Sequence, residues 1–569
     1  MADQAKSKRS HKRRWICVSV LVVLLAVAIG LFFYLRSAGF QDLVRRKLVA
    51  TLEEVTGGRV EIASFRWNLS QLAFDATDLT IHGLEPPSQA PYVHVDRALI
   101  QLHIISFFEK QFSVARLELQ RPVVHLIVNP DGSTNAPQPK LKPVAGRTFV
   151  QQLFDLQVAR ADLRDGLLLV NERRLPLDFS ASDLALSLSY RAQDGVHEYP
   201  GDLQIGKFDV RYGEFRDVPA SAALQFTLWE NALDIHDLKL LSQASLLQAS
   251  GKLTNFAQPQ VQLTYTASVD VAQVAAVTRS PELGRGTMLL NGSANYSLPA
   301  SYSTAGHVSL RNLDSRAAGV ALRRANIDAD FAFTQDALAL KKIAAGVFGG
   351  SVTGDAEVKN LLASQAAKAS EQPASASRSR RGAQEELAAG EQQGWARLRA
   401  SRLSLNELAR IFASRSLPLD KLNAAGRLTG TVNLDWRESP ENSVADLALD
   451  ITPPERPAAN ELPVSGSVRG RAALRRQRID LTALRLATPH SSLDASGSLG
   501  SNSAMLKLNA NTTSLAELKP LLAGNGAQPL PIELDGSASF NGTVSGPLRR
   551  PQIAGHLQAT NFSYLYTPS

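Results

Sequence analysis

The sequence predicts a mainly β chain, with a transmembrane helix near the N-terminus followed by an elongated antiparallel sheet built from repeats and a few short helices. Three observations predict this fold class. Residues 15–35 form an uninterrupted apolar run, apolar and polar residues then alternate with period two, and one strand–helix–strand pattern recurs three times. With 44% hydrophobic and 20% charged residues among 569, the chain can bury sizeable apolar surface.

The apolar run has the length of a membrane anchor. Its 21 uncharged residues would form a helix of about 31 Å, against about 30 Å for a bilayer core. A cleaved signal peptide is the alternative, but its apolar region would be shorter, and Arg36 stands where a small residue is needed. The anchor candidates are Trp15, Leu24, Leu25, Phe32, Phe33 and Tyr34.

The net charge of +8 is concentrated before this run. Residues 1–14 hold six Lys or Arg and one Asp, so they carry five of the eight net charges. This tail is expected to stay in the cytoplasm while the bulk of the chain is exported. The body is near neutral, so nucleic acid is not expected as a partner. The arginines of 378–381 and 469–478 are interpreted as a solvated linker and a solvated strand edge.

Helix signals after the anchor are few. Residues 40–55 carry an apolar stripe at helical spacing and end at Gly57-Gly58. Shorter helices are expected at 268–277, 404–412 and 514–522, and the last two begin with Ser three residues before Glu, which indicates a capping box.

Most of the remaining chain alternates between apolar and polar residues. Alternation gives a sheet one apolar and one polar face, and favours antiparallel hairpins over buried parallel sheets. The residues that we expect to line the apolar face are Val261, Leu263, Tyr265, Val432, Leu434, Leu506 and Leu508.

An internal repeat organises the second half. The segment starting at Leu238 aligns without a gap with the segment starting at Leu484, so that Gly251 meets Gly497. In both, an alternating strand, a short helix and further strands follow. A middle copy holds Gly354 and the 404–412 helix, and is interrupted by residues 364–394, whose composition predicts a disordered loop. Three copies favour a stacked, elongated architecture.

Four stretches resemble the AsmA family, which includes the TamB-like proteins of Gram-negative envelopes. The first is the anchor with its helix and residues 56–63, and the second is 74–81. Residues 114–135 resemble the family signature of a strand, a Pro, a second strand, then Asp-Gly and Asn, and 536–555 resemble TamB-type repeats. The resemblance covers residues 15–140 best, and 238–569 by repeat pattern.

The expected organisation follows from these features. It comprises a basic tail (1–14), a transmembrane helix (15–35), an AsmA-like N-terminal β module (36–140), a β-groove segment (141–237), repeat one with the start of repeat two (238–363), the insert (364–394), and the rest of repeat two with repeat three (395–569). The third repeat stops within a strand pattern, so we expect further chain or a docking partner there.

The resemblance implies a sheet curled into an open groove with an apolar interior. It also implies an inner-membrane protein, with its bulk in the periplasm, that carries phospholipid between the inner and outer membranes. At about 0.8 kcal/mol per buried CH₂, such a lining would hold part of an acyl chain without a catalyst or cofactor. Membrane phospholipids are therefore the expected partners, with outer-membrane assembly components as further candidates.

Two other functions are consistent with the sequence. An assembly factor for outer-membrane proteins, which the TamB-like resemblance implies, would use exposed strand edges to guide nascent strands. A passive envelope tether would instead have a dry β core.

No pattern predicts an enzyme or a metal site. The ten histidines form neither HxxxH nor HExxH; His94 and His103 are interpreted as surface or core residues, and Asp328 and Asp330 as a solvated pair. The single Cys17 excludes a disulfide framework, a Cys-based zinc site and a CxxC pair. GxSxG, P-loop and strand-following GxGxxG motifs are absent from the sequence.

Overall fold

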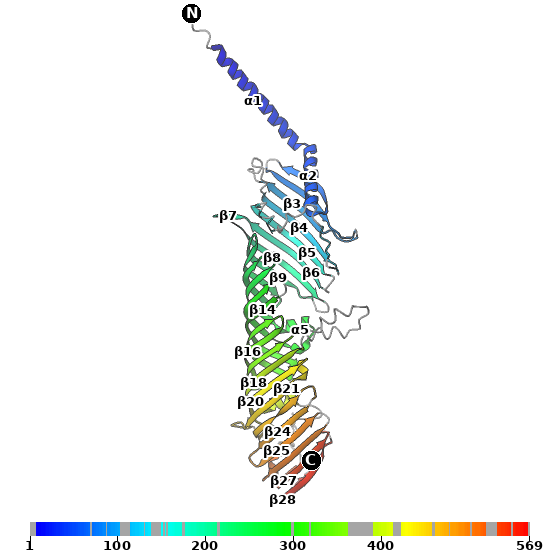
Figure 1. Ribbon diagram of the computed structural model, residues 1–569, viewed down its shortest axis with the longest axis vertical. Coiled ribbons are helices and arrows are strands. Elements are labelled where there is room, and N and C mark those ends of the chain that lie inside the picture. Colours follow the sequence, from blue (N-terminus) through cyan, green and yellow to red (C-terminus); the bar gives the residue numbers. More distant parts are fainter. Residues whose placement is uncertain are drawn as a thin grey trace. The chain divides into compact units, whose positions relative to one another are not determined.

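The computed structural model describes most of the chain as two compact units, Met1–Val261 and Gln262–Ser569. Figure 1 shows that strands make up most of both. The described residues are 7–68, 71–86, 88–102, 114–129, 131, 133–137, 150–151, 154, 157–172, 177–212, 217–297, 301–317, 320–361, 391–412, 423–457, 461–476, 478–500, 503–518, 532–547 and 550–566.

Two consecutive helices open the first unit. α1 (Ser7–Arg36) contains the predicted apolar run, and α2 (Ala38–Thr56) begins after Ser37, whose Oγ accepts a hydrogen bond from the Phe40 N–H (3.3 Å). α2 ends at Gly57, which has φ 77° and donates its N–H to the Glu53 carbonyl (2.9 Å). The predicted helix at 40–55 is therefore confirmed.

The first unit then forms a sheet in which most neighbours along the chain pair antiparallel. The exceptions are β4 and β5, which pair parallel, and β7, which forms a short hairpin with β8 while β6 pairs with β8. The chain between Val128 and Arg160 is long enough for the crossover that parallel neighbours need. The strands are β1 (Arg59–Asn68), β2 (Ala73–His82), β3 (Val93–Leu102), β4 (Val114–Val128), β5 (Arg160–Glu172), β6 (Leu177–Ser189), β7 (Arg191–Gln193), β8 (Val196–Tyr212), β9 (Ala220–Trp229), β10 (Ala232–Ser242) and β11 (Ser245–Thr254); β12 (Gln260–Asp270) crosses into the second unit.

Helical and loop segments cover parts of the apolar face of this sheet. Leu48 and Leu52 of α2 pack against the buried Val60 and Ile62 of β1. Farther along the sheet, the fully buried Tyr199 contacts Phe154 edge to face, with ring centroids 4.9 Å apart. Burial raises the pKa of the Tyr199 phenol to about 12.

In the second unit each long strand pairs antiparallel with the next, from β13 to β28. The short β19 (Ala424–Ala425) and β22 (Leu462–Pro463) form a separate parallel pair. The mainly β, antiparallel part of the prediction is confirmed. The long strands are β13 (Arg285–Ser297), β14 (Ser301–Ala317), β15 (Val320–Thr334), β16 (Ala337–Val347), β17 (Gly350–Lys359), β18 (Gln393–Ser404), β20 (Arg427–Arg437), β21 (Val444–Thr452), β23 (Ser465–Ala473), β24 (Arg478–Ala487), β25 (Ser491–Gly500), β26 (Ala504–Thr512), β27 (Ile532–Gly546) and β28 (Gln552–Tyr566).

One order of elements recurs along the aligned segments. Three strands (β10–β12), the helix α5 (Val271–Val277) and two strands (β13, β14) come first. The same order returns as β16–β18, α8 (Leu405–Phe412), β20 and β21. It returns again as β24–β26, the 3₁₀ turn η4 (Leu515–Leu518), β27 and β28. A bulge next to a positive-φ glycine lies in the first strand pair of each set, at Gly251 (φ 156°), Gly354 (φ 156°) and Gly497 (φ 131°).

The three short helices differ from their predicted lengths. Residues 268–270 belong to β12, and Asp270 caps α5 by accepting a hydrogen bond from the Ala272 N–H (2.8 Å). α8 follows the prediction, with the Ser404 Oγ accepting from the Glu407 N–H (3.4 Å). At the third predicted helix, the described residues form a 3₁₀ turn at 515–518 and not an α-helix.

Two predicted features fall largely outside the described residues. The insert at 364–394 is described only at its last four positions, of which Gln393 and Gly394 begin β18. Residues 519–522 of the third predicted helix and His103 are not among the described residues either.

Candidate functional site

The candidate residues of β20 and β26 share one face of the sheet within the second unit. Val432 lies opposite Leu398 on one neighbouring strand and Leu447 on the other. Following the register through β21, β23, β24 and β25 leads to Leu506, which lies opposite Gly497 and Val544. Because side chains on neighbouring strands at paired positions point to the same face, these two candidates lie on one surface, with four strands between them.

Leu434 and Leu508 follow the same rule. Leu434 pairs with Ala396 and Ala445, and Leu508 pairs with Ala495 and Gly542. Large and small side chains therefore meet across neighbouring strands.

The candidates on β12 join this face through a hydrogen bond. The Tyr265 hydroxyl and the Thr304 hydroxyl on β14 lie 2.7 Å apart. Thr304 shares its side of β14 with Val308, which pairs with Leu290 of β13. Leu263 alternates with Tyr265 on the same side of β12, and so does Val261, the last residue of the first unit.

The large side chains of this apolar face are half-buried. All seven candidates, from Val261 to Leu508, have intermediate exposure, whereas Gln262 and Thr264 between them are exposed. Most of the fully buried apolar residues of the unit are alanines, including Ala329, Ala396 and Ala495. A closed sandwich would bury its large inner side chains completely, so solvent reaches this face in the structure.

Short helices cover only parts of the face. Leu405 and Leu408 of α8 pack against a buried cluster that contains Leu403, Leu428 and Ile451. Val271 of α5 packs in a second cluster with Leu313 and Ala325.

An apolar pocket lies on this face near the end of the described chain. Its volume is about 460 Å³ and its walls are almost entirely apolar atoms. For scale, a dry cavity of about 150 Å³ lined by Leu, Ile and Phe can bind benzene. The large apolar side chains that line it come from β22, β24, β25, η4, β27 and β28, and are Leu462, Leu486, Leu493, Leu515, Leu518, Phe540 and Leu557.

The pocket was missed at the sequence level. None of the seven candidate residues lines it, because the walls come from elements far apart in the chain. The alternation of Leu484 and Leu486 on β24 signals an apolar face there, which Leu493 continues on β25, but nothing in the sequence pattern places η4 over it.

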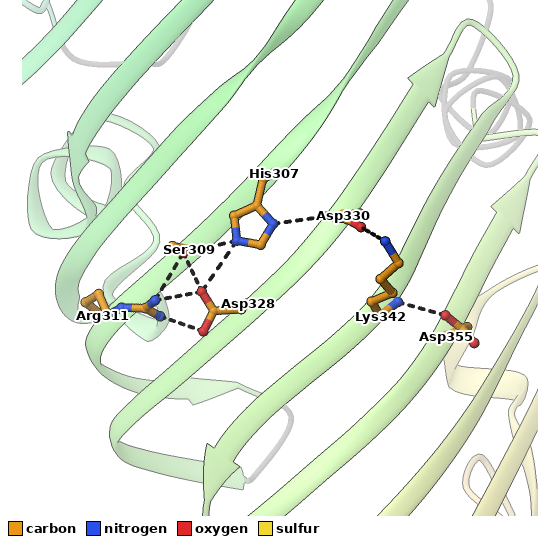
Figure 2. Close-up of polar contacts among 7 residues, drawn as sticks. All are labelled: His307, Ser309, Arg311, Asp328, Asp330, Lys342 and Asp355. Carbon is orange, nitrogen blue, oxygen red and sulfur yellow. Dashed lines mark hydrogen bonds and ion pairs between the residues drawn. The ribbon is translucent and has the colours of Figure 1, made fainter.

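The opposite face of the sheet carries paired charges. Figure 2 shows His307 between two carboxylates, with its Nδ1 3.0 Å from Asp330 and its Nε2 3.6 Å from Asp328. Arg311 binds Asp328 through both terminal nitrogens (2.9 and 2.7 Å), and Lys342 lies 3.0 Å from Asp330. These contacts, with the Arg311 hydrogen bond as the largest cause, lower the pKa of Asp328 to about 2. A carboxylate held ionised in this way is a poor proton carrier at neutral pH.

The arginines near residue 470 are likewise paired. Arg469 lies 2.6 Å from Asp450, and Arg471 lies 2.8 Å from Asp446 on the neighbouring strand. These two arginines therefore have protein carboxylates as counter-ions and are not poised for an external anion.

In the first unit, Asp131 and Asn135 of the Asp-Gly and Asn signature form hydrogen bonds that hold the chain after β4 against this strand. The side chain of the buried Asn135 accepts from the Ile127 N–H (2.8 Å) and donates to the His125 carbonyl (2.7 Å). Asp131 accepts from both the N–H and the hydroxyl of Ser133. The sequence pattern identified these residues as part of a motif, but it did not indicate that Asn135 forms hydrogen bonds with the backbone at the end of β4.

His94 contacts polar side chains of the same sheet. His94 lies 3.0 Å from Thr80 and 3.1 Å from Asp96, which also binds Arg121. Within the described ranges, no three His, Cys, Asp or Glu side chains are grouped so that they could hold a metal ion.

The N-terminal helix carries the anchor candidates. Ser19–Arg36 has a mean hydropathy of 2.4 and is long and apolar enough to cross a membrane. Leu24, Leu25, Phe33 and Tyr34 are all more than half exposed, and Phe32 contacts Phe33 edge to face. Trp15 lies within α1, but its side chain is outside the described set.

Comparisons with known protein families, curated proteins and solved structures find no match for this chain.

Proposed function

We propose that this chain is an inner-membrane-anchored periplasmic protein of the AsmA type that carries phospholipid between the inner and outer membranes. Its apolar face would form the lining of a β-groove along which acyl chains move. The observation that carries the proposal is the half-buried state of the large apolar side chains from Leu263 to Leu508, on one face of the sheet within the second unit.

The half-buried apolar side chains of this face still expose part of their surface to solvent, and an acyl chain could cover it. At roughly 25 cal/mol per Å², covering it with an acyl chain instead of water is favourable. The pocket of about 460 Å³ beside η4 offers a place where such a chain would be surrounded on several sides. A lining without strong polar contacts would let the chain slide, so transport would need no catalytic group in this protein.

The N-terminal helix supports the membrane side of the proposal. None of the residues of Ser19–Arg36 whose burial is described is buried, and the basic tail before the helix favours a cytoplasmic N-terminus. The β units would then lie in the periplasm, where the lipid that they receive would come from the inner membrane.

The test is the lipid bound by the full chain purified in mild detergent, measured by mass spectrometry. The control is a soluble protein fused to residues 1–37, which accounts for lipid that surrounds the helix alone. We expect several more phospholipids per full chain than per control. Equal lipid content would favour the dry tether, and crosslinking to unfolded outer-membrane barrels without extra lipid would favour the assembly factor.

A further inference from the structure

A second hollow in the Gln262–Ser569 unit has both apolar and cationic walls. Its volume is about 800 Å³, and it is lined by β15, the turn between β16 and β17, and α8. We call it the rim hollow. Its large apolar side chains include Leu322 and Phe348, and its charged side chains are Arg323, Arg324, Glu407 and Arg410.

The apolar wall of the rim hollow is continuous with the apolar face. Leu322 packs in the cluster that contains Leu310 and Ile327, which pair with each other across β14 and β15. Phe348 packs in the cluster of α8, beside Val352. An acyl chain lying on the face could therefore extend to the hollow without leaving apolar surroundings.

The cationic wall consists of three exposed arginines. Arg323 and Arg324 lie near the start of β15, and Arg410 lies in the last turn of α8. Within the part of the chain that the structure describes, none of the three has a carboxylate within ion-pair distance of its guanidinium group. Asp314, which binds Arg285, also accepts a hydrogen bond from the Arg324 N–H (2.8 Å), and this hydrogen bond and the charge of Arg324 help to lower the pKa of that carboxyl. Other arginines nearby are engaged: Arg285 lies 2.8 Å from Asp314, and Arg427 donates to the Gly349 carbonyl (3.1 Å).

The charges of the hollow do not balance. Glu407 is the single carboxylate among its lining residues, against the three arginines. On the polar face, by contrast, Arg311, Arg469 and Arg471 each have a carboxylate on a neighbouring strand. Guanidinium groups bind phosphate oxygens through paired, charge-assisted hydrogen bonds.

We propose that the rim hollow binds the phosphate of a phospholipid headgroup, with the acyl chains on Leu322, Phe348 and the apolar face beyond. The inference rests on the proposed function and adds to it a site that selects lipids by their headgroup. A free inorganic phosphate would satisfy the arginines equally well, but it would gain nothing from the apolar wall.

The test titrates the full chain in detergent with dioleoyl phosphatidylglycerol or dioleoylglycerol, which lacks the phosphate, and counts bound lipid by native mass spectrometry. Inorganic phosphate is measured separately by calorimetry. The variant R323Q/R324Q/R410Q is compared with R437Q/R456Q/R476Q, which removes the same charge from exposed arginines elsewhere in the unit. A third variant, R323K/R324K/R410K, keeps the positive charges but lacks the planar guanidinium groups that bind phosphate through two parallel hydrogen bonds.

We expect R323Q/R324Q/R410Q to weaken phosphatidylglycerol binding by about tenfold or more, since the charge-assisted hydrogen bonds to the phosphate are lost. Binding of dioleoylglycerol should be unchanged. The lysine variant should lie between this variant and the wild type, and R437Q/R456Q/R476Q should match the wild type. Thermal unfolding of all three variants checks that the fold is retained.

Three outcomes overturn the headgroup site. They are an equal loss in R437Q/R456Q/R476Q, an unchanged preference for phosphatidylglycerol in R323Q/R324Q/R410Q, and inorganic phosphate binding as tightly as the lipid. In each case the apolar groove can still bind lipid. Failure of the wild type to bind either lipid instead contradicts the proposed function itself.

Discussion

Arg311 and Asp328 face each other across β14 and β15, joined by two hydrogen bonds of 2.9 and 2.7 Å. Ser309 also donates to the same carboxylate, and His307 lies beside it. The pair lies on the polar face, opposite the surface that carries Leu310 and Ile327. Pairing charges across strands neutralises this face locally, which agrees with the near-neutral composition of the body.

The substitution Asp328→Asn should lower stability in a pH-dependent way. The folded-state pKa of Asp328 is about 2, below the roughly 3.9 of an unfolded Asp. Its contribution is therefore present above about pH 4 and is lost as the pH falls towards 2. Because the side chain is about one-third exposed (34%), we expect no more than about 1 kcal/mol at pH 7. Thermal unfolding at pH 7 and at pH 2.5 measures the difference.

The matched control is Asp494→Asn, whose carboxylate lies 3.8 Å from Arg485 and is 62% exposed. It should change the unfolding temperature less than Asp328→Asn does at pH 7. If Asp328→Asn has the same effect at pH 2.5 as at pH 7, the ion pair is not its cause.

A second prediction concerns the bulge glycines. A Cβ on Gly354 would lie 2.0 Å from the Arg397 carbonyl oxygen, and the backbone there has φ 156°. We expect Gly354→Ala to destabilise the second unit by roughly 1–3 kcal/mol or more, since the strands must separate to accept the methyl group. Gly346→Ala is the control, because its Cβ would meet nothing closer than 3.9 Å. Equal unfolding temperatures for the two variants would show that the bulge tolerates a side chain.

The third prediction concerns the hydrogen bonds between Asn135 and β4 in the first unit. Asn135→Ala removes two hydrogen bonds and leaves the buried Ile127 N–H without that acceptor, which should cost about 1–3 kcal/mol. Asn129→Ala, at a half-buried residue of the same loop whose side chain binds the Ser133 hydroxyl in an exposed hydrogen bond, should cost less. Hydrogen exchange at the Ile127 amide reports the effect directly, and an unchanged exchange rate in Asn135→Ala would mean that another group satisfies this amide.

The alternation of apolar and polar residues predicted which face of the sheet is apolar, but it did not predict which segments pack on that face or how distant strands pair. Alternation assigns Leu263 and Val432 to an apolar face because period two is a property of the strand itself. The parallel pairing of β4 with β5 depends on how a long connection returns, which strand patterns do not encode. The apolar pocket needs η4 to lie beside β24 and β27, so it appears only in three dimensions.

The short helices show how tertiary contacts change a local signal. The Ser514 and Glu517 pattern predicted a capping box, but the Glu517 carboxylate instead accepts hydrogen bonds from Thr488 and Ser491 (both 2.7 Å). Burial acts to raise the pKa of Glu517, and these hydrogen bonds outweigh it, so that the pKa is lowered. A carboxylate committed to a neighbouring turn cannot cap its own helix. The arginines of the rim hollow were missed for a similar reason, since Arg410 and Arg323 are distant in sequence.

The fourth prediction tests the orientation of the anchor. The basic tail before the apolar helix predicts a cytoplasmic N-terminus. A reporter joined after Gly195, in the exposed turn between β7 and β8, should therefore be active only on the exported side of the membrane. Alkaline phosphatase and green fluorescent protein fusions at the same position distinguish the two sides. Activity in the cytoplasm would contradict the proposed transport of lipid across the periplasm.

The last prediction separates an open apolar face from a dry core. Leu263→Glu places a charge on the half-buried apolar face, and Gln262→Glu places the same charge on the exposed polar face of the same strand. If the face is open to lipid, the carboxylate at 263 can reach water. Bound phospholipid should then fall several-fold while the unfolding temperature changes by only a few degrees, and Gln262→Glu should leave both unchanged. If the face is instead closed in solution, a buried charge costs several kcal/mol and Leu263→Glu should unfold the unit. Lipid analysis and thermal unfolding of the same samples decide between these cases, and equal lipid loss in both variants would contradict an apolar face on one side only.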